Sequence, residues 1–207
     1  MKVGAQDDKK EKNMIREQLK PALFSFILLT LIAGVFYPLL VTGVAQSFFK
    51  DKAEGSLIYQ NRSAVGSELI GQTFDDPKYF WGRPSATSSV SYNGAASSGS
   101  NLGPINPDFL KTVQTRVDTL KQADPSNPAP VPVDLVTASA SGLDPHISLA
   151  AAYYQLPRIA RLRNLSKEEV KKMIQKNTQN RFGGVLGEPV VNVLRLNLDL
   201  DTYKNTV

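Results

Sequence analysis

The chain has 207 residues, of which 42% are apolar and 21% are charged, so it can form one folded domain and an additional segment, and it is neither collagen-like nor wholly disordered. Its net charge of +5 does not indicate a nucleic-acid partner: the first twenty residues carry six bases and four acids, and the rest is nearly balanced. Cysteine is absent, which excludes thiolate-bound zinc and iron–sulfur clusters.

An uncharged, strongly apolar run extends from residue 21 to residue 49. As a helix it would span about 43 Å, which exceeds a hydrocarbon core of about 30 Å. A cleaved signal peptide is the alternative, because Gly43-Val44-Ala45 offers small residues for cleavage, but signal h-regions have only about 7–15 residues. We therefore predict a transmembrane helix over 21–49. Gly34 and Pro38 would weaken or kink a soluble helix, and their presence here favours packing against partner helices.

The charges that flank this run predict its orientation. Six basic residues precede it, whereas Lys50, Lys52 and Arg62 are the only ones that follow closely. The positive-inside rule then assigns residues 1–20 to a cytoplasmic tail. Residues 50–64 form a linker in this prediction, and 65–207 form an extracytoplasmic domain on the far side of the cell membrane.

The first part of that domain reads as a short β-prone segment, a long loop and a helix. Residues 65–74 contain the β-prone core, and no charged residue occurs from Pro84 to Pro107, where Ser, Ala, Asn and Gly favour irregular backbone. Such a loop is either a mobile linker or functional. Asn106 and Pro107 then open an amphipathic helix whose apolar stripe is Phe109, Val113, Val117 and Leu120.

The second part alternates between predicted strands and helices. Residues 131–139 alternate loosely as a strand, and Asp144-Pro145 reads as the N-cap and first residue of a helix that Pro157 kinks or restarts. Ser166 and Glu169 match a capping box that begins another helix. Residues 191–201 alternate leucine with polar residues, the period of a half-buried strand. The fold class is therefore α+β: one N-terminal transmembrane helix followed by a single mixed α+β domain.

Little in the sequence points to chemistry of its own. There is no GxxxxGK[ST] loop, and Asp-Lys occurs only at Asp51-Lys52, without the threonine-glycine-threonine of P-type phosphorylation sites. His146 is the only histidine, so a multi-histidine metal site within one copy is excluded. A triad of Asp144, His146 and a serine is one interpretation of this region, and helix capping by Asp144 is the other.

Several uncommon strings resemble the C subunit of the bacterial Kdp potassium-transporting P-type ATPase, in the order found there. They are GSELIGQTF, YFWGRPSAT, YNGAASSGSNLGPINP, DLVTASASGLDPHISLAAAYYQLPRIARLRN and GEPVVNVLRLNLDLD. The resemblance covers the apolar run and nearly all of the outer domain. It departs from the family in the basic extension before Lys20 and at residues 50–63.

The resemblance implies partners and a role. The partners are a potassium-channel-like A subunit, a P-type ATPase B subunit, a small F subunit and the lipid bilayer; K⁺ is transported and ATP is used by the complex, with no cofactor bound here. It implies an assembly factor or catalytic chaperone that raises the ATP affinity of the B subunit, with Gln155 and Arg158 of QLPR contacting nucleotide. The predicted topology instead places both residues across the bilayer from cytoplasmic ATP, where they would form a polar pair flanking Pro157.

Two functions from different classes follow. The first is a non-catalytic transport subunit whose region 83–106 docks on the outer face of the A subunit, with Trp81 in the core and Arg83 stacked or salt-bridged nearby. The alternative is a free-standing anchored domain that binds an extracellular ligand. Co-purification with a large ATPase discriminates between them.

Overall fold

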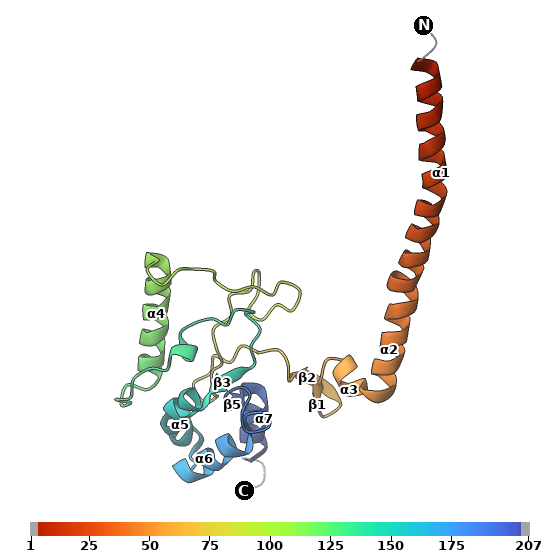
Figure 1. Cartoon of the computed structure of the whole chain (residues 1–207). Coiled ribbons are helices and arrows are strands. Elements are labelled where there is room, and N and C mark those ends of the chain that lie inside the picture. Colours follow the sequence, from red (N-terminus) through yellow and green to blue (C-terminus); the bar gives the residue numbers. More distant parts are fainter. Residues whose placement is uncertain (1–3, 204–207) are drawn as a thin grey trace. The chain divides into compact units, whose positions relative to one another are not determined.

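The structure is a computed structural model that describes the backbone of residues 4–203 and the side chains of residues 15–203. The chain divides into two compact units, Met1–Glu54 and Gly55–Val207 (Figure 1). Lys2, and the side chains of Lys9, Lys10 and Lys12, on which the predicted orientation partly depends, lie outside the described part.

The first unit is one helical rod followed by a short helix. The rod comprises α1 (Gly4–Leu31), the π-helical turn η1 (Ile32–Phe36) and α2 (Tyr37–Phe48); α3 (Lys50–Ala53) follows it. Residues Ile15–Phe48 are long and apolar enough to cross a membrane, and the apolar side chains along this segment are exposed. At about 1.5 Å per residue the 34 residues extend for about 50 Å. One candidate transmembrane helix is thus present where the sequence predicts it.

The rod contains one π turn, which includes Gly34 and immediately precedes Tyr37 and Pro38. The Tyr37 N–H donates to the carbonyl of Ile32, five residues earlier, immediately before Pro38. Proline has no N–H, and its ring crowds the carbonyl four residues before it, here that of Gly34. A single wider turn relieves this crowding, and the helix continues instead of breaking.

The second unit is α+β, as predicted. Its elements are β1 (Leu57–Gln60), β2 (Ser63–Ser67), α4 (Pro107–Ala123), the 3-10 turn η2 (Val133–Leu135), β3 (His146–Ser148), α5 (Leu149–Arg163), α6 (Lys167–Lys176), β4 (Thr178–Gln179), β5 (Val190–Asn192) and α7 (Val193–Tyr203). Strands β1 and β2 form an antiparallel hairpin, and β5 lies between β3 and β4 in a second antiparallel sheet. The segment expected as a linker, 50–64, holds α3, β1 and the start of β2.

The core lies where α5, α6 and α7 pack around the three-stranded sheet (Figure 1). The sheet contributes Ile147 and Val191, and the helices contribute Ile159, Ile174 and Leu196, each 0–1% exposed. Burying an aliphatic side chain of this size contributes about 1.5–3 kcal/mol. This small core therefore holds the surrounding irregular segments in place.

Two helix starts agree with the sequence. The Asn106 side chain accepts hydrogen bonds from the N–H groups of Asp108 and Phe109, and α4 begins at Pro107. Ser166 and Glu169 form the complete capping box of α6. No helix or strand occurs between Ser67 and Pro107, so the long loop is also confirmed.

The prediction of a strand over 191–201 is wrong for most of its length. Strand β5 ends at Asn192, and α7 occupies the rest. The buried residues Val193, Leu196 and Leu200 are spaced by three and four, as on one face of a helix, and Asn197 is buried on that same face. A pattern with leucine at every second residue also places leucines four residues apart, and residues four apart lie on one face of a helix.

Two further predictions need correction. Residues 131–139 form η2 and irregular backbone, not a strand. The helix expected to start at Asp144-Pro145 begins at Leu149, after β3, and is capped by Ser148, whose Oγ accepts from the Ala151 N–H at 3.0 Å. Pairing with β5 holds 146–148 extended, which delays the helix. The helix then passes through Pro157 without a restart.

Candidate functional site

Residues 77–81 form an irregular segment whose five consecutive carbonyls all accept hydrogen bonds from side chains of α5 and α7. Arg158 donates to the carbonyls of Pro77 and Tyr79, and Arg163 to that of Lys78. Asn197 donates to the carbonyl of Phe80, and Gln155 to that of Trp81. We call Gln155, Arg158, Arg163 and Asn197 the clasp residues. These side chains pair the backbone of a segment that belongs to no sheet.

Gln155 lies at the centre of this arrangement. Its Oε1 accepts from the Trp81 N–H at 2.8 Å, and its Nε2 donates to the Trp81 carbonyl at 3.1 Å. Arg158 donates from Nη2 to the same Oε1 at 2.7 Å, and its guanidinium lies 4.6 Å from the centre of the Trp81 ring. The two residues that the resemblance links to nucleotide are thus joined to each other and to Trp81.

Both residues are enclosed by the domain. Gln155 is 1% exposed and Arg158 is 2% exposed. Burial lowers the pKa of Arg158 to about 10, so the guanidinium is still charged at neutral pH, where carbonyls and an aromatic face surround it. A nucleotide could reach these side chains only after residues 77–81 moved away. Trp81 packs against the core, as expected, although its stacked arginine is Arg158 and not Arg83.

Sequence reasoning missed Asn197. Its Oδ1 accepts from the Phe80 N–H at 2.9 Å, and its Nδ2 donates to the Phe80 carbonyl at 2.9 Å. The strand interpretation placed this residue on the solvent face. Its i+4 spacing from Val193 was the available signal that it belongs to a buried helical face.

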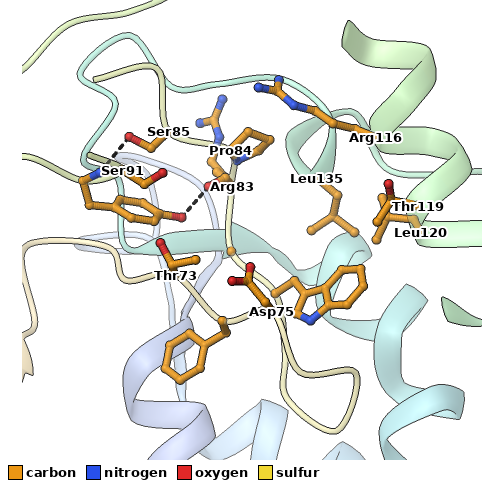
Figure 2. Close-up of a pocket in the computed structure, with 14 residues that line it drawn as sticks. Thr73, Asp75, Arg83, Pro84, Ser85, Ser91, Arg116, Thr119, Leu120 and Leu135 are labelled. Atoms are coloured by element: carbon orange, nitrogen blue, oxygen red, sulfur yellow. Dashed lines mark hydrogen bonds between the residues drawn. The ribbon is translucent and has the colours of Figure 1, made fainter. Parts of the chain in front are cut away.

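An open pocket of about 400 Å³ lies between the long loop and α4 (Figure 2). Arg116 extends from α4 toward the loop at Arg83 and Pro84, and Asp75 lies on the other side. Arg116 donates to the carbonyl of Val136 at 2.9 Å, and burial lowers its pKa. Leu120 and Leu135 contribute apolar surface. The pocket therefore combines an apolar wall with charges of both signs.

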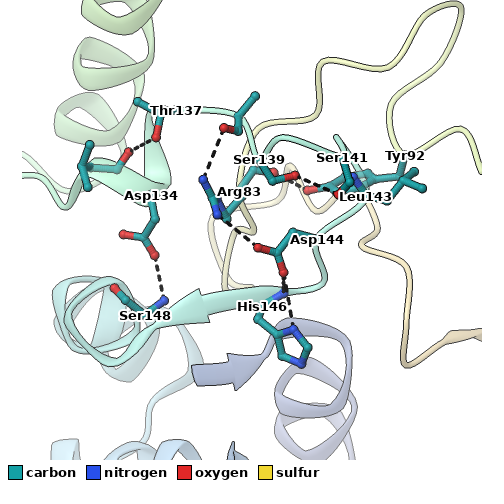
Figure 3. A network of polar contacts seen from close by, with 12 residues as sticks. Arg83, Tyr92, Asp134, Thr137, Ser139, Ser141, Leu143, Asp144, His146 and Ser148 are labelled. Carbon is teal, nitrogen blue, oxygen red and sulfur yellow. Dashed lines mark hydrogen bonds and ion pairs between the residues drawn. The ribbon is translucent and has the colours of Figure 1, made fainter. Parts of the chain in front are cut away.

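The loop is held beside this pocket by Arg83 and Asp144 (Figure 3). The Arg83 guanidinium lies 3.1 Å from a carboxylate oxygen of Asp144 and also donates to the Ala138 carbonyl. Burial by itself would raise the pKa of Asp144, but hydrogen bonds from His146 and Arg83 outweigh burial, and the net pKa is lowered. Asp144 is therefore an anchor for the loop, and it also accepts from the His146 N–H at 3.0 Å.

This network does not form a catalytic triad. His146 Nδ1 lies 3.4 Å from Asp144, but within residues 15–203 no serine hydroxyl bonds to His146 Nε2, which is buried without a hydrogen-bond partner. The described residues also contain no group of three His, Cys, Asp or Glu side chains that could hold a metal ion. The arrangement positions the backbone. Side chains of α5 and α7 hold residues 77–81, and Asp144 holds Arg83.

Comparison with known proteins gives consistent results. The model of the family described as K⁺-transporting ATPase, c chain (KdpC) matches residues 19–202. The potassium-transporting ATPase KdpC subunit of Methylococcus capsulatus is 60% identical over 185 residues, which cover 89% of this chain and 97% of the relative. The KdpC subunit of a Janthinobacterium species is 58% identical, over 90% of this chain and 99% of the relative. That of Herpetosiphon aurantiacus is 56% identical, over 92% and 99%.

Proposed function

The chain belongs to the KdpC family, the c chains of K⁺-transporting ATPases, and from this premise we propose that it is a non-catalytic accessory subunit of an ATP-driven potassium uptake complex. The observation that carries the proposal is the continuous match over residues 19–202, which includes both the apolar helix and the outer domain. In this proposal the subunit stabilises the assembled pump.

We propose that ATP is hydrolysed on the B subunit and that this chain acts on it indirectly. The burial of Gln155 and Arg158, each paired within the domain, supports a structural role for both. Any increase in the ATP affinity of the B subunit, the catalytic-chaperone effect, would then come from how the subunits assemble. If Gln155 and Arg158 contact nucleotide directly, the isolated full-length chain in detergent should bind a fluorescent ATP analogue, and Arg158→Lys should abolish this binding. If the chain acts on the B subunit only through assembly, the chain alone should not bind the analogue.

The long loop is the proposed docking surface for the channel-like A subunit. It carries three apolar side chains, Val90, Leu102 and Ile105, that are 63%, 43% and 89% exposed. A partner that covers this loop would bury these three apolar side chains. The chain has no cysteine, so the thiol of a Ser88→Cys or Ile105→Cys variant is the only one in this chain that a crosslinker can label. Capture of the A subunit from both positions supports docking here, and failure of both contradicts it.

The proposed orientation has the N-terminus in the cytoplasm and the domain outside, across the cell membrane. It depends on the excess of basic residues before the apolar helix. A phosphatase that is active only outside the cytoplasm, fused after Val207, should be active. A reporter that is active only in the cytoplasm should be silent at the same position, and the reverse result inverts the topology.

A second function is favoured by the pocket beside α4. Its volume of about 400 Å³ and mixed lining suit a small polar molecule, as expected of a free-standing anchored binding domain. Purification in mild detergent separates the two functions. Recovery of a large ATPase with the chain supports the subunit, whereas a chain that always purifies alone supports the binding domain.

A further inference from the structure

The hairpin between β4 and β5 presents apolar side chains that nothing in the described domain covers. Phe182 and Leu186 form an isolated antiparallel bridge at its tip, and Phe182, Val185 and Leu186 are 82%, 76% and 65% exposed. Gly183 and Gly184 have φ of +59° and +77°, and a Cβ on either would meet no atom within 4 Å. The tip is therefore a narrow turn that projects from the fold with three apolar side chains on it.

A basic helix directly precedes this hairpin. The exposed side of α6 carries Lys171 and Lys172, neither of which forms an ion pair with any residue that the structure describes. Of the acids nearby, Glu169 closes the capping box and both oxygens of Glu188 accept from Arg181, whereas Glu168 is exposed in the first turn of α6. Helix α6 thus exposes two lysines without a close ion pair among the described residues, of which Lys172 interacts electrostatically with Glu169, and the hairpin that follows exposes three apolar side chains.

The linker between the candidate transmembrane segment and the second unit is short. The candidate transmembrane segment ends at Phe48, and the second unit begins at Gly55. The six residues between them reach at most about 20 Å when fully extended. Gly55, where the second unit begins, therefore stays within about 20 Å of the end of the candidate transmembrane segment.

We propose that the hairpin tip, Phe182–Leu186, inserts into the headgroup layer of an anionic phospholipid bilayer, with Lys171 and Lys172 bound to lipid phosphates. Exposed aromatic and aliphatic groups combined with basic side chains bind membrane interfaces, where lysines are attracted by anionic headgroups in the leaflet that faces the domain. A protein partner fits less well, because lysine is depleted in the cores of protein interfaces.

The test uses the full-length chain in nanodiscs and takes advantage of the absence of cysteine. A single Phe182→Cys variant is labelled with an environment-sensitive dye, in discs of phosphatidylcholine alone or with phosphatidylglycerol. Val133→Cys is the matched control, because Val133 is an apolar residue with 69% exposure outside the hairpin. We expect blue-shifted emission at position 182, and quenching by a spin label near the lipid headgroup, in the anionic discs only. The dye at position 133 should show neither.

Charge removal then tests the lysines. Replacing Lys171 and Lys172 by glutamine in the labelled chain should lower the ratio of inserted to free hairpin about 30-fold in anionic discs, if each charge contributes as at other anionic surfaces. Lys111→Gln with Lys121→Gln, two exposed lysines of α4, is the control pair. The proposal is overturned if position 182 responds no more than position 133 in anionic discs. It is also overturned if the response appears only when the other pump subunits are present, since the hairpin would then bind protein.

Discussion

Gln155 on α5 and Asn197 on α7 hold two consecutive backbone units in the same way: each side-chain amide accepts from the N–H and donates to the carbonyl of one residue, Trp81 for Gln155 and Phe80 for Asn197. An amide side chain presents one acceptor and one donor edge, the same groups that a neighbouring strand would offer. Two helices therefore take the place of sheet partners for this irregular segment. The position of the long loop that follows Trp81 depends on this pairing.

Asn197→Ala should destabilise the domain by about 2–4 kcal/mol, because it leaves the buried N–H and carbonyl of Phe80 without partners. Urea unfolding of the full-length chain in detergent measures this, and Trp81, the only tryptophan, reports directly from the clasp. Gln114→Ala is the control. Gln114 is exposed and its side chain donates to Asp118, so its loss should change the free energy of unfolding by less than about 0.5 kcal/mol. Equal effects of the two variants would contradict the pairing.

Arg158→Lys should also be destabilising, by about 1–3 kcal/mol, although it preserves the positive charge. Lysine cannot reproduce the planar fork that reaches the carbonyls on one side and Gln155 on the other. The emission of Trp81 should shift as well, because the guanidinium stacked on its ring is lost. Arg161→Lys is the matched control on the same helix, since Arg161 is half exposed and pairs with Asp124 by charge. A stable Arg158→Lys chain with unchanged emission would refute the structural role.

The helix caps and the clasp differ in how far the sequence predicts them. The capping box at Ser166 and the cap at Asn106 were predictable because the chemistry of a cap lies within four residues. The clasp was not, since Gln155 and Trp81 are 74 residues apart and neither lies in a pattern that refers to the other. Likewise the leucines of α7 fit a strand as well as a helix, and the pairing of Asn197 with the Phe80 backbone, 117 residues away, is part of neither pattern. The spacing of apolar residues along the chain does not reveal which side chains pair with a distant backbone segment.

Acid should weaken the domain through Glu169. Hydrogen bonds from the Ser166 hydroxyl, then from Tyr203 and the Ser166 backbone, lower the pKa of Glu169 to about 2. A carboxylate with a depressed folded-state pKa stabilises the protein above its ordinary pKa near 4.5, and this stabilisation is lost as the pH falls toward 2. The difference in melting temperature between the unmodified chain and Glu169→Gln should therefore shrink as the pH falls from about 6 to 2.5.

Thermal unfolding followed by circular dichroism measures this difference. Glu168→Gln is the control, because Glu168 lies in the same first turn of α6 but outside the capping box. Its difference from the unmodified chain should show a smaller dependence on pH over the same range. If the Glu169→Gln difference is independent of pH, the carboxylate does not stabilise the capping box in the way that the structure indicates.

Alanine substitutions at Gly142 and Gly183 distinguish the cost of disturbing the long loop from the cost of backbone strain. Both have positive φ, +67° and +59°, but a Cβ on Gly142 would lie 2.6 Å from the Ser98 carbonyl oxygen, whereas one on Gly183 would meet nothing within 4 Å. Gly183→Ala should therefore cost about 1–2 kcal/mol, the penalty of a left-handed conformation alone. Gly142→Ala should cost about 1–3 kcal/mol more, because the loop at Ser98 must move to make room. Equal losses of stability for the two glycine variants, measured by urea unfolding, would show that the loop does not pack against Gly142 in solution.

The loop also contains Ser88. If this segment is the docking surface, Gly142→Ala should reduce crosslinking from position 88 to the A subunit.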